Sequence, residues 1–261
     1  MKGYSKMENM KIFVVSHKEV NFPNQKIYIP IQVGNGKSFT EIRDNTGENI
    51  SPKNKNFCEL TAAYWIWKND NSKIVGITHY RRYFFKNKFS NSINNILDEK
   101  DIESILKKYD IIVPEIENIV KYTVEEAYGY YHHINDFNKC RKIINEIYPE
   151  YVESFDEVAS RKQVYLYNMF IAKKEVFDLY YKWLFDILFE LEKRVDLTDY
   201  SDYNKRIYGF LSERLFNVWL LKNNNLKIKE MPVYNIEKNV LPQIGIRTLQ
   251  KILLKIKRGK K

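Results

Sequence analysis

The chain has only two cysteines among its 261 residues, Cys58 and Cys140. Two thiols are too few for a disulfide framework, and these two lack the spacing of metal ligands. No uncharged apolar run approaches the roughly 20 residues of a membrane-spanning helix, and the N-terminus shows no apolar stretch with a small-residue cleavage site. We therefore expect a reduced, cytoplasmic protein without a transmembrane helix or a signal peptide.

Several short motifs with known chemistry are also missing. The sequence has no glycine-rich phosphate loop, no Gly-x-Ser-x-Gly nucleophile elbow and no His-Glu-x-x-His zinc motif. His132 and His133 are adjacent, and side chains at adjacent positions usually point apart. A metal site also needs more ligands than these two. These absences exclude the enzyme classes that depend on such motifs.

The chain has fewer acidic than basic residues, and the excess positive charge is unevenly distributed along the sequence. The chain has 43 Lys and Arg against 33 Asp and Glu, a formal net charge of +10. Seven of the basic residues lie in 241–261, a segment without acidic residues, which leaves +3 for the first 240 residues. This distribution argues against a nucleic-acid-binding face spread over the whole chain.

The basic C-terminal segment has a helical pattern. Leu249, Ile252, Leu253 and Ile256 fall at the spacing of one helix face, and the lysines lie off that stripe. A basic amphipathic helix of this kind can lie on an anionic membrane surface. The alternative is a helix packed on the rest of the protein with a frayed, lysine-rich end.

Apolar runs typical of buried strands alternate with segments of helical periodicity. Strands are expected at 11–16, 73–80, 109–114, 164–172 and 226–233, and segment 26–34 is expected to be a strand or an extended loop. Helices are expected at 54–68, 101–108, 174–193 and 206–222, with two more between 136 and 159. The alternation predicts an α/β protein with a mostly parallel mixed sheet flanked by helices. Without repeats or low-complexity linkers, we expect one domain at 1–240 and a tail at 241–261.

The most distinctive local motif is Thr-His-Tyr-Arg-Arg-Tyr-Phe at 78–84, at the carboxyl end of an expected strand. Ligands of open α/β sheets bind outside the carboxyl ends of the strands. Arg81 and Arg82 offer forked donors suited to phosphate oxygens, and His79 could donate a hydrogen bond or act as a base. The alternative is that one arginine pairs with a carboxylate while the other is solvated.

Two further polar residues are ambiguous from the residues alone. Glu213 lies near the start of an expected helix, where a carboxylate could serve a ligand but also commonly caps the helix. Asn168 interrupts an otherwise apolar strand, where it could bind a hydroxyl group or terminate the strand.

Taken together, seven stretches resemble the bacterial glycosyltransferases of capsular and exopolysaccharide biosynthesis, long a family of unknown function. The stretches, which occur in the family's order between residues 11 and 235, are IFVVSHK (12–18), IQVG (31–34), DNTGENIS (44–51), CELTAAYWIWKN (58–69), GITHYRRYF (76–84), YNMFIAKKEVFDLYYKWLF (167–185) and YGFLSERLFNVWL (208–220). The resemblance implies a GT-A-like domain that transfers a sugar from a nucleotide-sugar donor to a carbohydrate acceptor. Some relatives are thought to transfer galactose or galactofuranose from UDP.

The resemblance also bears on metal use. In ordinary GT-A enzymes, the strand that reaches the donor ends in Asp-x-Asp, which holds a divalent metal on the diphosphate. Here the corresponding strand ends in His79-Tyr80-Arg81-Arg82, so the arginines are the cations available to stabilise the leaving UDP. We expect no metal and no cofactor beyond the UDP-sugar, with a metal held by Asp199 and Asp202 as the alternative.

By the same resemblance, site residues can be assigned. Glu213 matches the acidic base of inverting enzymes, and we expect it to catalyse transfer together with His79, Arg81 and Arg82. The expected donor-binding residues are His17, Lys18, Gln32, Asp44, Asn54, Arg81, Arg82 and Asn168. Glu59 and Thr61 are expected to support them.

The resemblance implies a lipid-linked saccharide as acceptor, at the inner face of the cell membrane. The basic tail would hold the enzyme there as a peripheral protein on the anionic surface. Two alternatives stay open at this point: a non-catalytic nucleic-acid-binding protein, and a catalytically inactive, membrane-associated assembly partner with the same fold.

Overall fold

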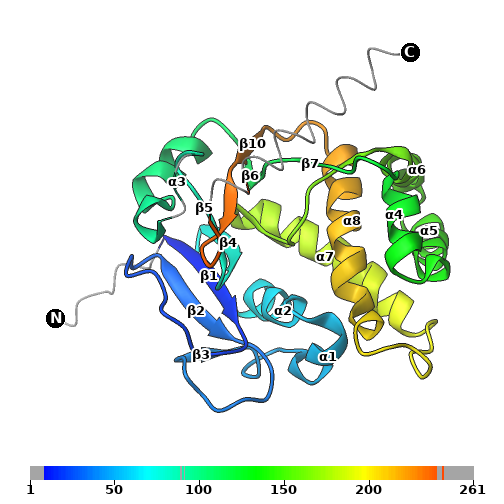
Figure 1. Cartoon of the computed structure of the whole chain (residues 1–261), viewed down its shortest axis with the longest axis horizontal. Helices are drawn as coiled ribbons and strands as arrows, with labels where there is room; N and C mark the ends of the chain where they lie inside the picture. Colours follow the sequence, from blue (N-terminus) through cyan, green and yellow to red (C-terminus); the bar gives the residue numbers. More distant parts are fainter. Residues whose placement is uncertain (1–8, 89, 91, 240–242, 244–261) are drawn as a thin grey trace.

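The computed structural model describes residues 9–88, 90, 92–239 and 243 (Figure 1). The strands are β1 (Met10–Ser16), β2 (Tyr28–Gln32), β3 (Ile42–Arg43), β4 (Ile74–His79), β5 (Arg82–Phe84), β6 (Ile111–Pro114), β7 (Glu117–Asn118), β8 (Gln163–Val164), β9 (Phe170–Lys173), β10 (Ile228–Met231) and β11 (Val233–Asn235). The α-helices are α1 (Asn54–Phe57), α2 (Leu60–Asn69), α3 (Glu99–Leu106), α4 (Val124–Tyr131), α5 (Ile134–Ile147), α6 (Val152–Ser160), α7 (Lys174–Glu192) and α8 (Ile207–Lys222). The basic amphipathic helix expected in the tail lies outside the described residues.

The described strands form one large mixed sheet and a separate pair, β7 and β8. The main path of the large sheet runs β10-β6-β9-β4-β1-β2-β3, and β5 and β11 pair off this path. β1 is parallel to both β2 and β4, β2 to β3, and β10 to β6, whereas β9 is antiparallel to β4 and β6. The predicted mostly parallel mixed sheet flanked by helices is therefore confirmed.

Both faces of the central strand β1 are buried, as expected where helices cover a sheet on two sides. Phe13 and Val15 belong to the larger core cluster, which includes residues of α2, α7 and α8. Ile12 and Val14 face the smaller cluster, with residues of α3 and β5. Figure 1 shows α3 and the group α4 to α8 on opposite sides of the sheet. In the part of the chain that the structure describes, no helix has the length and apolarity needed to cross a membrane.

The single helix expected at 54–68 is wrong, because the chain breaks it between α1 and α2. Cys58 has a φ of +51°, in a region that residues other than glycine seldom adopt. The break is held by side chains: Asn54 Nδ2 donates to the Cys58 carbonyl (2.8 Å), and Thr61 Oγ1 donates to the same oxygen (3.0 Å). The apolar periodicity continues across the break, which is why the sequence pattern does not reveal it.

The single strand expected at 164–172 is also wrong. It divides into β8, which pairs with β7, and β9, which enters the large sheet. Between them Tyr167 and Asn168 have φ values of +81° and +48°, so the backbone turns out of the extended conformation there. Helix α4 and the short strands β3, β5, β7 and β11 were not expected from the sequence as separate elements.

Candidate active site

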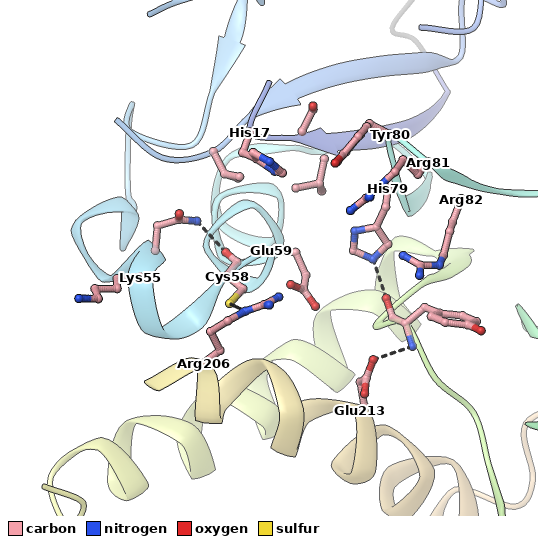
Figure 2. A pocket seen from close by; sticks show the side chains of 15 residues that line it. His17, Lys55, Cys58, Glu59, His79, Tyr80, Arg81, Arg82, Arg206 and Glu213 are labelled. Carbon is pink, nitrogen blue, oxygen red and sulfur yellow. Dashed lines mark hydrogen bonds between the residues drawn. The ribbon is translucent and has the colours of Figure 1, made fainter. Parts of the chain in front are cut away.

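A cavity of about 610 Å³ opens at the carboxyl ends of β1 and β4. These strands are adjacent and parallel, with Val15 opposite His79. His17, just after β1, and His79, at the end of β4, therefore lie at the same edge of the sheet and line the cavity. The rest of its lining comes from the β4–β5 turn, α1, the α1–α2 break, Tyr167, α8 with the residue before it, and Val33 after β2 (Figure 2).

One wall of the cavity carries the two adjacent arginines. His79 and Arg82 pair across a hairpin between β4 and β5, and Tyr80 and Arg81 form its turn. Arg81 Nη1 lies 3.6 Å from Glu237, and the Arg82 guanidinium lies 4.8 Å from the centre of the Tyr167 ring. Among the described residues, the Arg82 guanidinium has no hydrogen-bond or ion-pair partner, so its donors can serve a ligand.

The opposite wall adds two cations that the sequence analysis missed. Lys55 lies on α1, and Arg206 is the residue just before α8. Figure 2 shows both across the cavity from Arg82. Arg206 Nε donates to Cys58 Sγ (3.2 Å), and Lys55 Nζ lies 3.3 Å from the exposed Asp202. Exposed ion pairs contribute little, so the Lys55 ammonium group can exchange this partner for a ligand.

Two carboxylates, Glu213 and Glu59, lie between these walls (Figure 2). Glu213 Oε1 accepts a hydrogen bond from the Tyr167 backbone N–H (3.0 Å), and Oε2 accepts one from Arg214 Nη1 (2.8 Å). Burial raises the pKa of Glu213, an effect that Arg214 opposes and Glu59 reinforces. A raised pKa makes the ionised carboxylate a stronger proton acceptor than an ordinary glutamate.

Burial favours the neutral form of both pocket histidines. Burial lowers the pKa of His79, and its Nε2–H donates to the Tyr167 carbonyl at 2.6 Å. This bond ties the end of β4 to the same residue whose N–H holds Glu213. Burial also lowers the pKa of His17, with further contributions from Lys18 and Arg81. His79 therefore acts in this structure as a donor that positions Tyr167.

The structure brings six of the expected site residues together at the cavity. These residues are His17, Asn54, His79, Arg81, Arg82 and Glu213. Among the supporting residues, Glu59 lines the cavity as well, whereas Thr61 is buried and receives a hydrogen bond from Asn54 (3.0 Å).

Gln32 and Asp44 do not line the cavity. Gln32 is fully buried and closes the loop after β2, donating to the Lys37 carbonyl (2.9 Å) and accepting from the Phe39 N–H (3.0 Å). Asp44 is also buried and accepts a hydrogen bond from Ser51 Oγ (3.0 Å). Gln32 therefore holds the loop after β2 and Asp44 holds the segment after β3, and neither side chain reaches the cavity.

Lys18 and Asn168 do not line the cavity either, but each contacts a residue that does. The Lys18 ammonium lies 5.1 Å from the centre of the Tyr80 ring. Asn168 is buried, and its Nδ2 donates to Glu59 Oε1 (2.8 Å) and to the Gly209 carbonyl (3.1 Å). Asn168 therefore positions Glu59 against the start of α8.

The end of β4 does not suit a divalent cation. Hard cations take oxygen ligands, and here the strand end carries guanidinium groups, which have no acceptor atoms. Within the described ranges, no group of three or more His, Cys, Asp or Glu side chains could hold a metal ion. Of the two aspartates considered for a metal, Asp202 pairs with Lys55 (3.3 Å).

Comparison with known proteins shows which family the chain belongs to. The sequence model of a domain of unknown function, DUF4422, matches residues 11–224. A solved structure described as the apo form of the WbbM bifunctional glycosyltransferase is similar, with 32% identity and a TM-score of 0.81 over 88% of this chain. That match covers 46% of the other protein, so the present chain spans about half its length. None of the curated proteins compared with the chain matches it. The fold is GT-A-like, and the chain belongs to the DUF4422 family.

Proposed function

We propose that the protein is a glycosyltransferase that moves a sugar from a UDP-sugar donor to a saccharide acceptor. The observation that carries this proposal is a single cavity at the carboxyl ends of two parallel strands, where arginines face carboxylates. The similarity to a solved bifunctional glycosyltransferase supports it.

The diphosphate of the donor would lie between the two cationic walls. The cavity is lined by four cationic side chains, Lys55, Arg81, Arg82 and Arg206. Guanidinium groups match phosphate oxygens with paired donors. Because negative charge grows on the departing UDP, cations held at this position stabilise the transition state more than the ground state. The proposal is therefore metal-independent transfer.

Glu213 would act as the general base. It would take the proton of the attacking hydroxyl group as the acceptor oxygen bonds to the anomeric carbon. The bond from that carbon to the UDP oxygen breaks at the same time, and UDP leaves with the electron pair. This direct displacement inverts the anomeric configuration.

For the donor sugar and the acceptor, the proposal follows the family resemblance of the sequence. The donor sugar would be galactose or galactofuranose, and the acceptor a lipid-linked saccharide of capsular or exopolysaccharide synthesis. The basic segment 241–261 would hold the protein on the anionic inner face of the membrane.

The proposal is tested by measuring UDP release. Purified protein is incubated with UDP-galactose or UDP-galactofuranose, with and without membrane vesicles that carry lipid-linked saccharide. We expect UDP release that depends on the saccharide. Binding of UDP without any release would instead identify a catalytically inactive assembly partner.

A further inference from the structure

Three rings in mutual contact, those of His132, Tyr203 and Phe210, form a small aromatic patch beside the cavity. The His132 and Phe210 rings lie 4.0 Å apart with 22° between their planes, and the His132 and Tyr203 rings lie 5.7 Å apart with 21°. Tyr203 and Phe210 also contact each other, at 5.0 Å. Tyr203 is 55% exposed, so the patch presents an aromatic surface to solvent. Clustered apolar surface with polar neighbours is typical of a ligand-binding site.

The patch joins segments that lie far apart in the sequence. His132 follows α4, Tyr203 lies in the loop after α7, and Phe210 lies in the first turn of α8. His132 Nδ1–H donates to Asn204 Oδ1 (3.1 Å), which fixes the ring and the loop together. Burial lowers the pKa of His132, which favours a neutral ring. The rings are thus held in place before any ligand arrives.

The patch is continuous with the catalytic side of the cavity. The Arg206 guanidinium lines the cavity and lies 5.6 Å from the centre of the Phe210 ring. Phe210 also precedes Glu213 by three residues on α8, a spacing that puts both side chains on one helix face. Arg214 Nη1 joins them, because it donates to the Phe210 carbonyl (2.9 Å) and to Glu213 Oε2 (2.8 Å). Figure 2 shows Arg206 and Glu213 along the α8 side of the cavity.

We propose that the aromatic patch binds one sugar ring of the saccharide acceptor and directs its hydroxyl group toward Glu213. A sugar ring has an apolar face of C–H groups and a rim of hydroxyl groups. The exposed ring of Tyr203 matches the apolar face, while Asn204 supplies a polar partner at the rim. In the proposed function the cationic walls bind the diphosphate. The aromatic patch has no charged side chain and therefore suits the uncharged sugar ring of the acceptor. This inference rests on the proposed function and adds the acceptor subsite to it.

The test compares Tyr203→Ala, Tyr203→Phe and wild type in two binding measurements. Calorimetry measures UDP affinity, and saturation-transfer NMR measures binding of methyl β-galactopyranoside and methyl β-glucopyranoside, each with and without UDP. Tyr203→Ala should weaken saccharide binding about five- to tenfold and leave UDP affinity unchanged. Tyr203→Phe keeps the ring and should bind like wild type. Leu179→Ala, which truncates another exposed apolar side chain, should change neither.

Each other outcome overturns the inference. Equal saccharide binding by wild type and Tyr203→Ala, or no binding of either saccharide to wild type, removes the subsite. Loss of UDP affinity in Tyr203→Ala would show that the patch holds the uracil ring of the donor. Failure of wild type to bind UDP is a separate result, which contradicts the proposed function itself.

Discussion

Replacing Glu213 with glutamine should slow sugar transfer about 10²- to 10⁴-fold, the contribution typical of a general base. Glutamine has nearly the same shape, and its carbonyl oxygen can still accept the hydrogen bond from the Tyr167 N–H. It cannot take a proton, however. In the proposed mechanism Glu213 acts on the proton of the acceptor and does not bind UDP. UDP affinity should therefore stay within about threefold of wild type. Initial rates of UDP release and calorimetric titration measure the two effects.

Glu59→Gln is the matched control, because Glu59 is the second carboxylate of the cavity. Its Oε1 accepts a hydrogen bond from Asn168, which assigns it a positioning role. We expect a smaller loss of rate than for Glu213→Gln. If Glu59→Gln abolishes transfer and Glu213→Gln does not, Glu59 is the base and the present assignment is wrong.

The pH dependence of transfer provides a second test of Glu213. Only the ionised carboxylate can accept the proton, so the rate falls as pH decreases through the pKa of Glu213. Burial raises that pKa above the ordinary value of 4.5, and the acid limb of kcat/KM should therefore lie above pH 4.5. An acid limb at or below pH 4.5, with full activity throughout mild acid, would contradict the role.

Replacing Arg82 with glutamine should weaken UDP binding about 10- to 100-fold, because a charge-assisted hydrogen bond contributes about 1.5–3 kcal/mol. Transfer should slow further, since the charge that develops on the leaving UDP loses a stabilising cation. The Arg82 guanidinium stacks on Tyr167 without an ion pair among the described residues, so its removal leaves no carboxylate unpaired there. Calorimetry with UDP and with uridine separates the effect on diphosphate binding from the effect on nucleoside binding.

Uridine provides the internal control for Arg82→Gln. It lacks phosphate groups, so its affinity should be unchanged by the substitution. Arg82→Lys keeps the charge without the fork of donors and should be intermediate. Arg141→Gln removes an exposed arginine paired with Asp156 and should have no effect. Equal loss of UDP and uridine binding would mean that Arg82 supports the fold of the pocket and does not bind phosphate.

The sequence indicated where the cavity lies, because the carboxyl ends of neighbouring parallel strands meet at one edge of a sheet. β1 and β4 are buried on both faces and therefore appear as apolar runs. Parallel strands put their carboxyl ends at one edge, which explains why His17, His79 and the arginines meet. Glu213 lies on a helix remote in sequence, and the family resemblance, not periodicity, brought it into the prediction.

The parts that could not be predicted depend on unusual backbone conformation and on long-range contacts. The positive φ values at Cys58, Tyr167 and Asn168 occur in segments whose apolar pattern suggests unbroken elements. Arg206 meets Cys58 across a separation of 148 residues, and no local pattern distinguishes it from other surface arginines. The buried side chain of Gln32 shows that a polar residue at a strand end can hold a loop by hydrogen bonds without lining the cavity.

In the proposed mechanism, arginines and not a metal ion hold the diphosphate. The most direct test is calorimetric titration of UDP into the full chain with EDTA present, followed by excess Mn²⁺ in the same cell. We expect UDP to bind in EDTA, with little change in affinity when Mn²⁺ is added. Binding that appears only after Mn²⁺ is added would contradict the claim and make the diphosphate site metal-dependent.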